Sequence, residues 1–385
     1  MSVVRLEGAL RRYDWGSPTA IPELLGVEPD GRPLAELWFG AHPDDPSTAP
    51  DHGATLDEII AADPLQALGS SVVERFGERL PFLLKVLAAD KALSIQVHPT
   101  REQAHAGFAA EDAAGVPRDD PNRNYRDPNH KPELICALTP FEALCGFRPV
   151  VETRALLTEL AVPELEFLSA ALAGPDPLRT AFTAVLEHDD AGSLVAALTA
   201  AAEGLGRHSD LARVVELTST DFPGDVGVVL AVLLNYVRLD PGEAIYLGAG
   251  NVHAYLRGTG IEIMANSDNV LRCGLTGKHV DVAELLKVTD FSELPDPRWR
   301  ATNGVFAVPV PDFRLVPFAV DGLVTLGDDE PWVVLCTAGT VAVGGSVLTP
   351  GYAAFVPAAD ESVPVEGKGT VFAAAAGVTV PMAPD

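Results

Sequence analysis

Cysteine is scarce in this sequence. Only four cysteines occur in 385 residues, at positions 136, 145, 273 and 336, and no two of them form a C-x-x-C pair. So few thiols in so long a chain argue against a disulfide framework and favour reduced cysteines, as in a cytosol.

Long hydrophobic runs are missing as well. The most apolar stretch covers nine residues, from Val226 to Leu234, whereas a membrane-spanning helix needs ~20. The first residues include an acid, Glu7, and no apolar run of the kind found in a secretory leader. We therefore expect a soluble protein of the cytoplasm with no membrane partner.

Positive charge is in short supply. Lysine and arginine total 27 against 54 acidic residues, which gives a formal net charge of −27. Nucleic acids and anionic membranes both require a positive protein surface, so we expect neither as a partner. A small anionic substrate remains compatible with this balance, because a single pocket can be locally basic.

Several catalytic signatures are absent too. The sequence has no G-x-x-x-x-G-K-[ST] phosphate loop, no G-x-S-x-G elbow and no H-E-x-x-H motif. The glycines at 248 and 250 are not part of a G-x-G-x-x-G and precede a β-like run, so a dinucleotide site is not supported. A hydrophobic content of 47% with 21% charged residues is nevertheless typical of a globular chain with a real core.

The residues that are present divide the chain into three regions of different composition and expected secondary structure. Residues 1–149 mix turn signals with short β-like runs, apart from helices expected within 55–79. Residues 150–235 are rich in Ala and Leu at helical spacing and predict an all-α insertion. From residue 236 onward, Gly and Pro again punctuate short Val-rich runs. We expect a mainly β protein in which 1–149 and 236–290 form one barrel, 150–235 a helical domain and 291–385 a second barrel.

The β-rich regions contain a weak internal repeat. At an offset of 109 residues, the turn and strand that start at Pro241 align with those that start at Pro350, and two later glycines of each copy also align. A Pro-Gly turn, a strand, a polar loop and a Gly-containing turn are typical of cupin-type jelly-roll barrels, although Pro-Gly before a strand is common. His253 of the first copy matches Ser362 of the second, so a metal bound through His253 would leave the second barrel without that ligand.

Four side chains suit a divalent metal: Gln96, His98, Glu133 and His253. Gln96 and His98 are two residues apart in an alternating strand, so both can reach one point inside a barrel. Two imidazoles, a carboxylate and an amide oxygen suit a borderline ion such as zinc. On spacing alone, a strand pair satisfied by ordinary hydrogen bonds remains the alternative.

A second polar group lies between residues 262 and 278. Arg272 and Lys278 could hold a phosphate or stabilise a developing oxyanion. The alternative is a solvated strand edge on which these cations pair with Glu262 and Asp268.

A third group consists of Lys85, Ser94 and Lys131. Lys85 lies within the apolar strand 80–87 and needs a partner or a pocket, because burial of an unpaired ammonium is expensive. The alternative is a lysine at a strand end that extends to water.

Six stretches carry a family resemblance. The sequence resembles the type I mannose-6-phosphate isomerases, also called phosphomannose isomerases, most clearly in Y-R-D-P-N-H-K-P-E at 125–133 and in the long run 253–272. Two positions depart from the family pattern: Cys273 stands where Ala is usual, and Gly277 stands where Pro precedes Lys278. The second departure loosens the turn that positions Lys278. The other matching stretches are Y-D-W-G from 13, A-E-L-W-F-G-A-H-P from 35, P-F-L-L-K from 81 and L-S-I-Q-V-H-P from 93.

The resemblance implies a zinc-dependent enzyme with two cupin-type jelly-roll β-barrels and an all-α domain. It would interconvert mannose 6-phosphate and fructose 6-phosphate by proton transfer between C1 and C2 through an enediol. It implies one zinc per chain on the four ligands above, Arg272 as the catalytic arginine, and a monomer whose partner is a small sugar phosphate. The expected substrate-binding residues are Trp15, Lys85, Ser94, Lys131, Glu262 and Lys278.

Several points stay open at this stage. Glu262, Lys131, a zinc-bound water and a water beside His98 are all candidates for the general base, and Trp15 suits either a pocket wall or the core. Two other classes of protein would share these motifs, a metal-dependent cupin dioxygenase and a sugar-binding cupin without activity. A breakdown role and a biosynthetic role are equally compatible with the residues.

Overall fold

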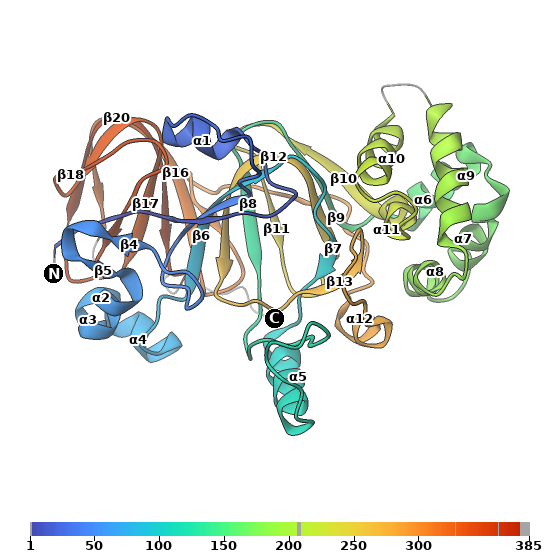
Figure 1. Ribbon diagram of the computed structural model, residues 1–385, viewed down its shortest axis with the longest axis horizontal. Coiled ribbons are helices and arrows are strands. Elements are labelled where there is room, and N and C mark those ends of the chain that lie inside the picture. Colours follow the sequence, from blue (N-terminus) through green and yellow to red (C-terminus); the bar gives the residue numbers. More distant parts are fainter. Residues whose placement is uncertain (1, 206–208, 328, 361, 378–385) are drawn as a thin grey trace.

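The computed structural model describes residues 2–205, 209–327, 329–360 and 362–377. The molecule is mainly β with helices, as predicted (Figure 1). A smaller sheet lies at one end, a larger sheet lies in the middle, and a group of helices lies at the other end. No helix among the described residues is both long and apolar enough to cross a membrane.

The larger sheet has 11 strands and carries the predicted metal ligands. Its main path runs β14-β11-β8-β12-β6-β3-β2, and β7, β9, β10 and β13 join it through β12 and one another. The bounds are β2 Ala9–Arg11, β3 Glu36–Phe39, β6 Phe82–Ala89, β7 Ile95–Val97, β8 Glu133–Ala137, β9 Phe141–Phe147, β10 Leu234–Leu239, β11 Ala244–Leu247, β12 His253–Ala265, β13 Leu271–Gly274 and β14 Arg298–Trp299.

Strand β12 connects two groups of strands within this sheet. Its first part pairs with β7 and β9, and from Gly258 onward it pairs with β6 and β8. Gly258 lies at the change of partners with φ of 119°, and a Cβ there would lie 2.6 Å from Pro140 O. Only glycine fits this left-handed, crowded position, so the bend of β12 is encoded at one residue.

The smaller sheet has seven strands in the order β1-β19-β17-β20-β16-β15, with β18 on β17. Its consecutive strands β19 and β20, which lie on either side of β17, follow the plan of β11 and β12, which lie on either side of β8: a four-residue strand precedes a 13-residue strand in both. Gly367 repeats the conformation of Gly258, with φ of 121° and a Cβ that would lie 2.6 Å from Thr340 O. The bounds are β1 Val4–Leu6, β15 Phe306–Ala307, β16 Arg314–Leu326, β17 Trp332–Val343, β18 Ser346–Leu348, β19 Ala353–Val356 and β20 Val363–Ala375.

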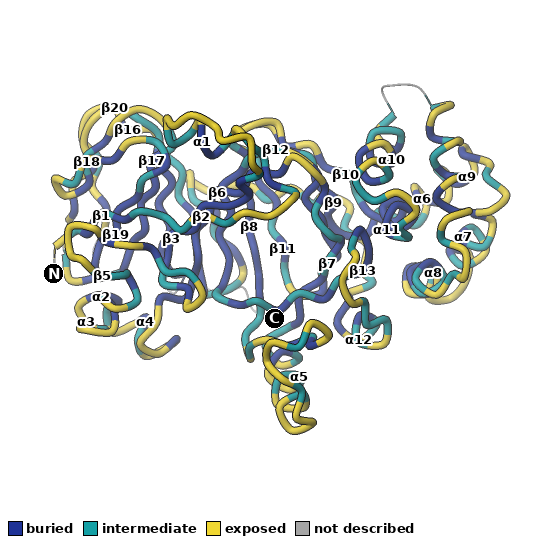
Figure 2. Tube along the Cα trace, in the orientation of Figure 1, coloured by how far each residue is buried: buried dark blue, intermediate teal, exposed yellow. Residues whose placement is uncertain are grey.

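The two sheets exchange strands and share a core. Strand β1 pairs with β19, although we grouped residues 1–149 with the larger sheet, and β14 pairs with β11, although we grouped 291–385 with the smaller one. One hydrophobic cluster contains Phe82 of β6 together with Phe355 of β19. The sheets therefore pack against each other through buried apolar side chains and are not separate bodies. In Figure 2, buried residues follow the strands of both sheets.

Helices replace strands between β9 and β10, in the region predicted to be helical. Their leucines, with residues such as Ile95 and Leu144 of the larger sheet, form one buried cluster. The bounds are α6 Val150–Leu160, α7 Glu166–Ala171, α8 Pro177–Leu186, α9 Ala191–Glu203, α10 Asp210–Asp221 and α11 Gly227–Leu230.

The remaining helices flank the sheets. Three short helices occupy the predicted helical region 55–79, and α12 follows β13. A two-stranded sheet of β4 (Thr48–Ala49) and β5 (Ala54–Thr55) precedes the three short helices. The bounds are α1 Ala20–Leu25, α2 Leu56–Ala62, α3 Pro64–Leu68, α4 Ser70–Phe76, α5 Arg101–Ala113 and α12 Val282–Val288.

Candidate active site

Strand β7 lies between β12 and β13, so it brings residues from distant parts of the sequence together. Gln96 is directly opposite His253 of β12 on one side and Arg272 of β13 on the other. Directly opposite residues share a face of the sheet, so these three belong to one surface. Three residues from distant parts of the sequence thus meet through strand register alone.

Three of the predicted metal ligands form a compact, buried group. One ligand atom from each of His98, Glu133 and His253 lies within 4.8 Å of the others. His98 Nε2 is 3.5 Å from Glu133 Oε1, and His253 Nε2 is 3.4 Å from Glu133 Oε2. All three residues are at most 1% exposed. Two imidazole nitrogens and a carboxylate at these separations suit one divalent cation.

Backbone carbonyls orient both imidazoles toward the carboxylate. His98 Nδ1 lies 2.7 Å from Asn269 O and His253 Nδ1 lies 2.9 Å from Asn251 O. Since a carbonyl only accepts, each Nδ1 carries the proton and each Nε2 keeps its lone pair. Among the described residues, His98 Nε2 and Glu133 Oε2 are buried without a hydrogen-bond partner. Such unpartnered, converging atoms fit a bound cation.

The fourth predicted ligand lies at the edge of this group. The amide nitrogen of Gln96 is 3.3 Å from His253 Nε2. Rotation of the amide by half a turn brings its oxygen, the metal-ligating atom, to that place. The structure therefore brings all four predicted ligands together.

The charge of the group is controlled by its neighbours. Burial raises the pKa of Glu133, but Lys131, whose Nζ is 2.9 Å from Glu133 Oε1, and His98 hold it well below its usual value. Burial lowers the pKa of His98 to about 4. A charged Glu133 beside a neutral His98 is the protonation state that a metal ion requires of these two groups.

A row of charged and aromatic residues crosses three strands beside the metal group. Trp38 of β3, Lys85 of β6 and Glu262 of β12 are directly opposite one another. Lys85 Nζ lies 3.0 Å from Glu262 Oε2, 3.6 Å from Glu36 Oε1 and 5.0 Å from the ring centre of Trp38. Trp38 Nε1 donates to Glu36 Oε2 at 2.9 Å. The lysine is 5% exposed, so the alternative of an ammonium that extends to water is wrong.

This buried cluster holds an excess of negative charge. Burial raises the pKa of Glu262, and the nearby Glu133 and Glu36 raise it further against the effect of Lys85. Burial by itself lowers the pKa of Lys85, but Glu262 and Glu36 raise it above its ordinary value. Lys85 therefore stays charged, and Glu262 is a stronger base than Glu133.

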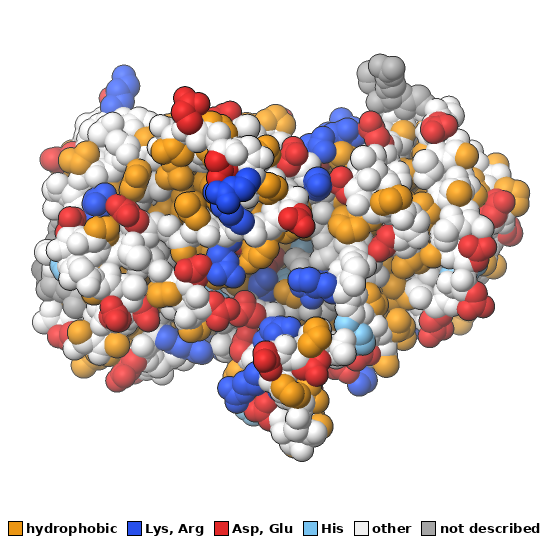
Figure 3. Space-filling view, viewed as in Figure 1, with side chains coloured by type: hydrophobic (Ala, Val, Ile, Leu, Met, Phe, Trp, Pro, Cys, Tyr) orange, Lys and Arg blue, Asp and Glu red, His pale blue; other side chains and the backbone are white. Residues whose placement is uncertain are grey.

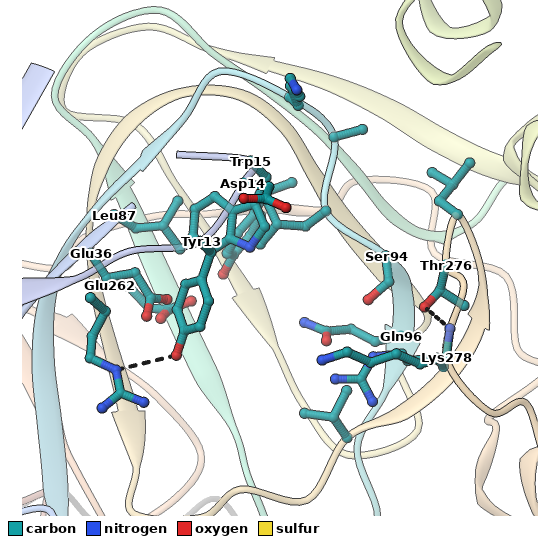
Figure 4. Close-up of a pocket in the computed structure, with 18 of the residues that line it drawn as sticks. Tyr13, Asp14, Trp15, Glu36, Leu87, Ser94, Gln96, Glu262, Thr276 and Lys278 are labelled. Atoms are coloured by element: carbon teal, nitrogen blue, oxygen red, sulfur yellow. Dashed lines mark hydrogen bonds between the residues drawn. The ribbon is translucent and has the colours of Figure 1, made fainter. Parts of the chain in front are cut away.

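These residues line a cavity of about 910 Å³. Figure 3 shows basic side chains gathered around a hollow on this face of the molecule. In Figure 4, Glu36 and Glu262 lie on one side of the pocket, and Ser94, Gln96, Thr276 and Lys278 lie on the other. The pocket is therefore divided into a carboxylate side and a cationic side.

The cationic side contains three positive groups with no carboxylate partner among the described residues: Arg126, Arg272 and Lys278. The guanidinium of Arg126 donates to the backbone carbonyls of Arg118 and Asp120, and its backbone N–H donates to Asn269 Oδ1. Burial and Arg126 lower the pKa of Arg272, and Arg272, burial and Arg126 lower the pKa of Lys278. Positive charges that lower the pKa of Arg272 and of Lys278 in this way favour a bound anion. The alternative of a strand edge paired with Glu262 and Asp268 is not what the structure shows, since Glu262 pairs with Lys85.

The remaining predicted residues also line the cavity. Trp15 stacks on Tyr13, with ring centres 5.5 Å apart, and Ser94 lies near Lys278 (Figure 4). Lys85 and Lys131 line it too, but each has its charge balanced by a glutamate. Sequence reasoning missed Arg126 and Thr276, although Arg126 stands inside the motif at 125–133.

Comparisons with known proteins agree with this geometry. Residues 3–150 match the family model of the phosphomannose isomerase type I catalytic domain. The mannose-6-phosphate isomerase of Escherichia coli is 39% identical over 384 residues, which cover 95% of this chain and 97% of that protein. The mannose-6-phosphate isomerase of Emericella nidulans is 33% identical, with 96% and 93% covered.

Solved structures are similar over nearly the whole chain. The crystal structure of a mannose 6-phosphate isomerase bound with zinc and yttrium superposes with a TM-score of 0.89 at 36% identity and covers 98% of this chain and 100% of that one. A mutant of phosphomannose isomerase from Salmonella typhimurium gives a TM-score of 0.90 at the same identity and coverage.

Proposed function

The chain belongs to the type I mannose-6-phosphate isomerase family, and from that premise we propose that it interconverts mannose 6-phosphate and fructose 6-phosphate with one bound zinc ion. The observation that carries the proposal is a pocket lined by Glu133 of the metal group, whose Oε2 has no hydrogen-bond partner among the described residues, and by three cations that have no carboxylate partner among them. A metal site next to an anion site fits a sugar phosphate.

Gln96, His98, Glu133 and His253 would hold the zinc ion. Its chemistry is that of a Lewis acid, which favours negative charge on the sugar oxygens nearby. The donor set fits this ion because it offers two neutral imidazoles, one carboxylate and one amide, and because both Nδ1 atoms are fixed by backbone carbonyls.

The phosphate group belongs on the cationic side of the pocket. Lys278 and Arg272 present positive charge there, and Ser94 and Thr276 add hydroxyl groups at the same side (Figure 4). Arg126 raises the local positive potential from the rim. Lys85 is a poor phosphate ligand, because its charge already balances buried glutamates.

The reaction moves a proton between C2 and C1, and the proton next to a carbonyl is weakly acidic. Arg272 lies beside the metal ligands and stays charged, so it stabilises the negative charge of the enediolate. We assign the proton transfer to Glu262, whose buried carboxylate lines the pocket and has a raised pKa. A carboxylate with a raised pKa is the stronger base, which suits general base catalysis near neutral pH.

The finer features of the fold are part of the same proposal. The repeated succession of a short and a long strand, with its matching glycines, supports two cupin-type jelly-roll barrels, and the helices between β9 and β10 support a separate all-α domain. We retain 1–149 with 236–290, 150–235 and 291–385 as the domain bounds. A monomer in the cytoplasm remains the expected state, with four free, buried cysteines in keeping with a reducing compartment.

A coupled assay that measures fructose 6-phosphate formed from mannose 6-phosphate tests the function. Arg272→Ala should lower kcat by about a hundredfold or more, because a donor at the developing oxyanion is lost. Arg300→Ala, on an exposed surface, is the matched control. No isomerase activity in the zinc-loaded wild type, or oxygen uptake with loss of substrate, would contradict the proposal. Activity of Arg272→Ala within a few-fold of the wild type would remove the catalytic role of that arginine.

A further inference from the structure

The junction between α10 and α11, residues 221–227, contacts both loops on the cationic side of the pocket. Asp221 and Phe222 line the cavity themselves. One loop carries Ser94 and follows β6, and the other carries Thr276 and Lys278 and follows β13. The helical segment is therefore in direct contact with the two loops that present hydroxyl groups and cations to the substrate.

Asp225 holds the second loop through its backbone. Its Oδ1 accepts from Leu275 N at 2.7 Å and its Oδ2 accepts from Thr276 N at 3.1 Å. Oδ1 also accepts from Gly227 N at 2.7 Å, which fixes the carboxylate on α11. Hydrogen bonds to a carboxylate are the stronger kind, and here a single side chain ties two successive residues to a helix.

The loop is held in a conformation that needs such support. Leu275 has φ of 52°, a left-handed value that a leucine side chain disfavours. Gly227 and Gly274 let the two backbones meet: a Cβ on Gly227 would lie 2.4 Å from Leu275 N, and a Cβ on Gly274 would lie 2.6 Å from Gly227 Cα. The approach of α11 to the loop is thus closer than any residue with a side chain permits.

A second carboxylate at the junction holds the other loop. Asp221 Oδ2 accepts from Ala92 N at 2.8 Å, two residues before Ser94. The two aspartates fix the loops of Ser94 and Lys278 to the same short segment. This sets the spacing between the groups that face the phosphate.

We propose that Asp225 is a positioning residue for phosphate recognition, and that the α10–α11 junction acts as a clamp that spaces the two loops. The inference rests on the proposed function, since it takes the cationic side as the phosphate site. The clamp also compensates for Gly277, which stands where the family pattern has a proline and which loosens the turn before Lys278. Asp225 holds this turn through the backbone of Leu275 and Thr276. Thr276 stands one residue before Gly277 and two before Lys278.

Asp225→Asn tests the clamp, because one oxygen becomes an amide donor that faces a backbone N–H. The KM for mannose 6-phosphate should rise about tenfold, and kcat should stay within about threefold, since the loop binds but does not react. The inhibition constant of inorganic phosphate should rise by the same factor as KM, and bound zinc should stay at the wild-type ratio. Asp190→Asn is the matched control, because Asp190 also accepts from a backbone N–H in the helical segment, away from the pocket.

Gly227→Ala tests the same contact without a change of charge. The added Cβ must push Leu275 away, so KM and the phosphate inhibition constant should both rise. Gly192→Ala in α9 is its control, because the nearest atom to that Cβ lies 3.9 Å away. If either variant is too unstable to purify, the other still tests the clamp.

The outcomes separate the clamp from the proposed function. A merely structural role would lower the melting temperature and the active fraction but leave KM and phosphate inhibition unchanged, and that result overturns the inference. A wild type that binds inorganic phosphate by calorimetry but does not isomerise the sugar contradicts the proposed function. In that case, weaker phosphate binding by Asp225→Asn still supports the clamp, and equal binding refutes it.

Discussion

The consecutive strands β11 and β12 and the consecutive strands β19 and β20 have the same lengths and the same glycine position but different side chains. At the offset of 109 residues, buried His253 corresponds to exposed Ser362, and the buried acid Glu262 corresponds to Val371, which is fully buried in an apolar cluster. Both copies keep the glycine at which the long strand bends. The strand geometry is thus independent of the chemistry, and the same framework encloses either a charged site or a hydrocarbon core.

The two copies also balance their interiors in different ways. The larger sheet buries Lys131 against Glu133 and Lys85 against Glu262, and each charge depends on its partner. The cluster inside the smaller sheet consists mostly of valine and alanine. Buried ion pairs contribute little net free energy of folding compared with apolar packing. The charged interior of the larger sheet is therefore explained by the chemistry of the site and not by stability.

Removal of a metal-facing carboxylate should give the largest difference in zinc content and activity between a variant of the larger sheet and a matched variant of the smaller sheet. Glu133→Gln loses the charge that faces both imidazoles, so zinc binding should fall steeply and turnover should fall about a thousandfold or more. Glu366→Gln makes the same change on an exposed part of β20 and should leave both quantities unchanged. Metal analysis and the isomerase assay measure the effect. Full zinc content with full activity in Glu133→Gln would place the metal elsewhere.

Removal of one member of a buried ion pair should give the next largest effect. Lys85→Met leaves Glu262 and Glu36 buried without their cation, so the free energy of unfolding should fall by about 3–5 kcal/mol. Urea unfolding of the zinc-free protein measures this loss. The double variant Lys85→Met with Glu262→Met removes one of the two uncompensated carboxylates and should recover part of the lost free energy of unfolding. Equal stability of Lys85→Met and the wild type would mean that the pair is not buried as the structure has it.

The parts of this site that sequence reasoning reached are those encoded by local pattern or by a long motif. Gln96 and His98 share a face because a strand alternates, and Glu133 and Arg272 stand in motifs that few other families would carry. The helical region follows from neighbouring residues, and the matching of His253 with Ser362 follows from a fixed offset. Spacing alone left an ordinary strand pair as the alternative to a metal site, and the full ligand set came from the family resemblance.

The parts that it missed depend on contacts between distant segments. Strand register places Lys85 opposite Glu262, 177 positions away along the chain, and no local signal marks Asp225 as the partner of Leu275. The same holds for β1, whose three residues complete a sheet made by the other end of the chain. Such pairings depend on how whole elements pack, so a pattern read along the sequence does not contain them.

Acid should weaken the larger sheet through a histidine that has no counterpart in the smaller one. The pKa of His98 is lowered by burial to about 4, below the ordinary value of 6.5. The unfolded chain therefore binds more protons than the folded one between these pH values, and stability falls as the pH falls from 6.5 to about 4. The loss is at most about 3 kcal/mol.

Urea unfolding of the zinc-free protein across this pH range measures that loss. His98→Asn removes the titrating group while it keeps a polar side chain, so its stability should depend less on pH in the same window. Identical slopes for the wild type and His98→Asn would assign the acid sensitivity to other groups.

The smallest effect should come from an attempt to restore the missing ligand in the second copy. Ser362→His places an imidazole at the position that matches His253, but Ser362 is exposed and has φ of 55°, whereas His253 is fully buried in a strand. The position that matches Glu262 is the apolar Val371, and among the described residues neither group of side chains that could hold a metal ion includes one from the smaller sheet. Zinc content should stay at the wild-type ratio, activity should be unchanged, and stability should change by no more than about 1 kcal/mol from the backbone conformation. A second equivalent of tightly bound zinc would contradict this, and it would mean that the two copies differ by a single ligand and not by the whole environment of the site.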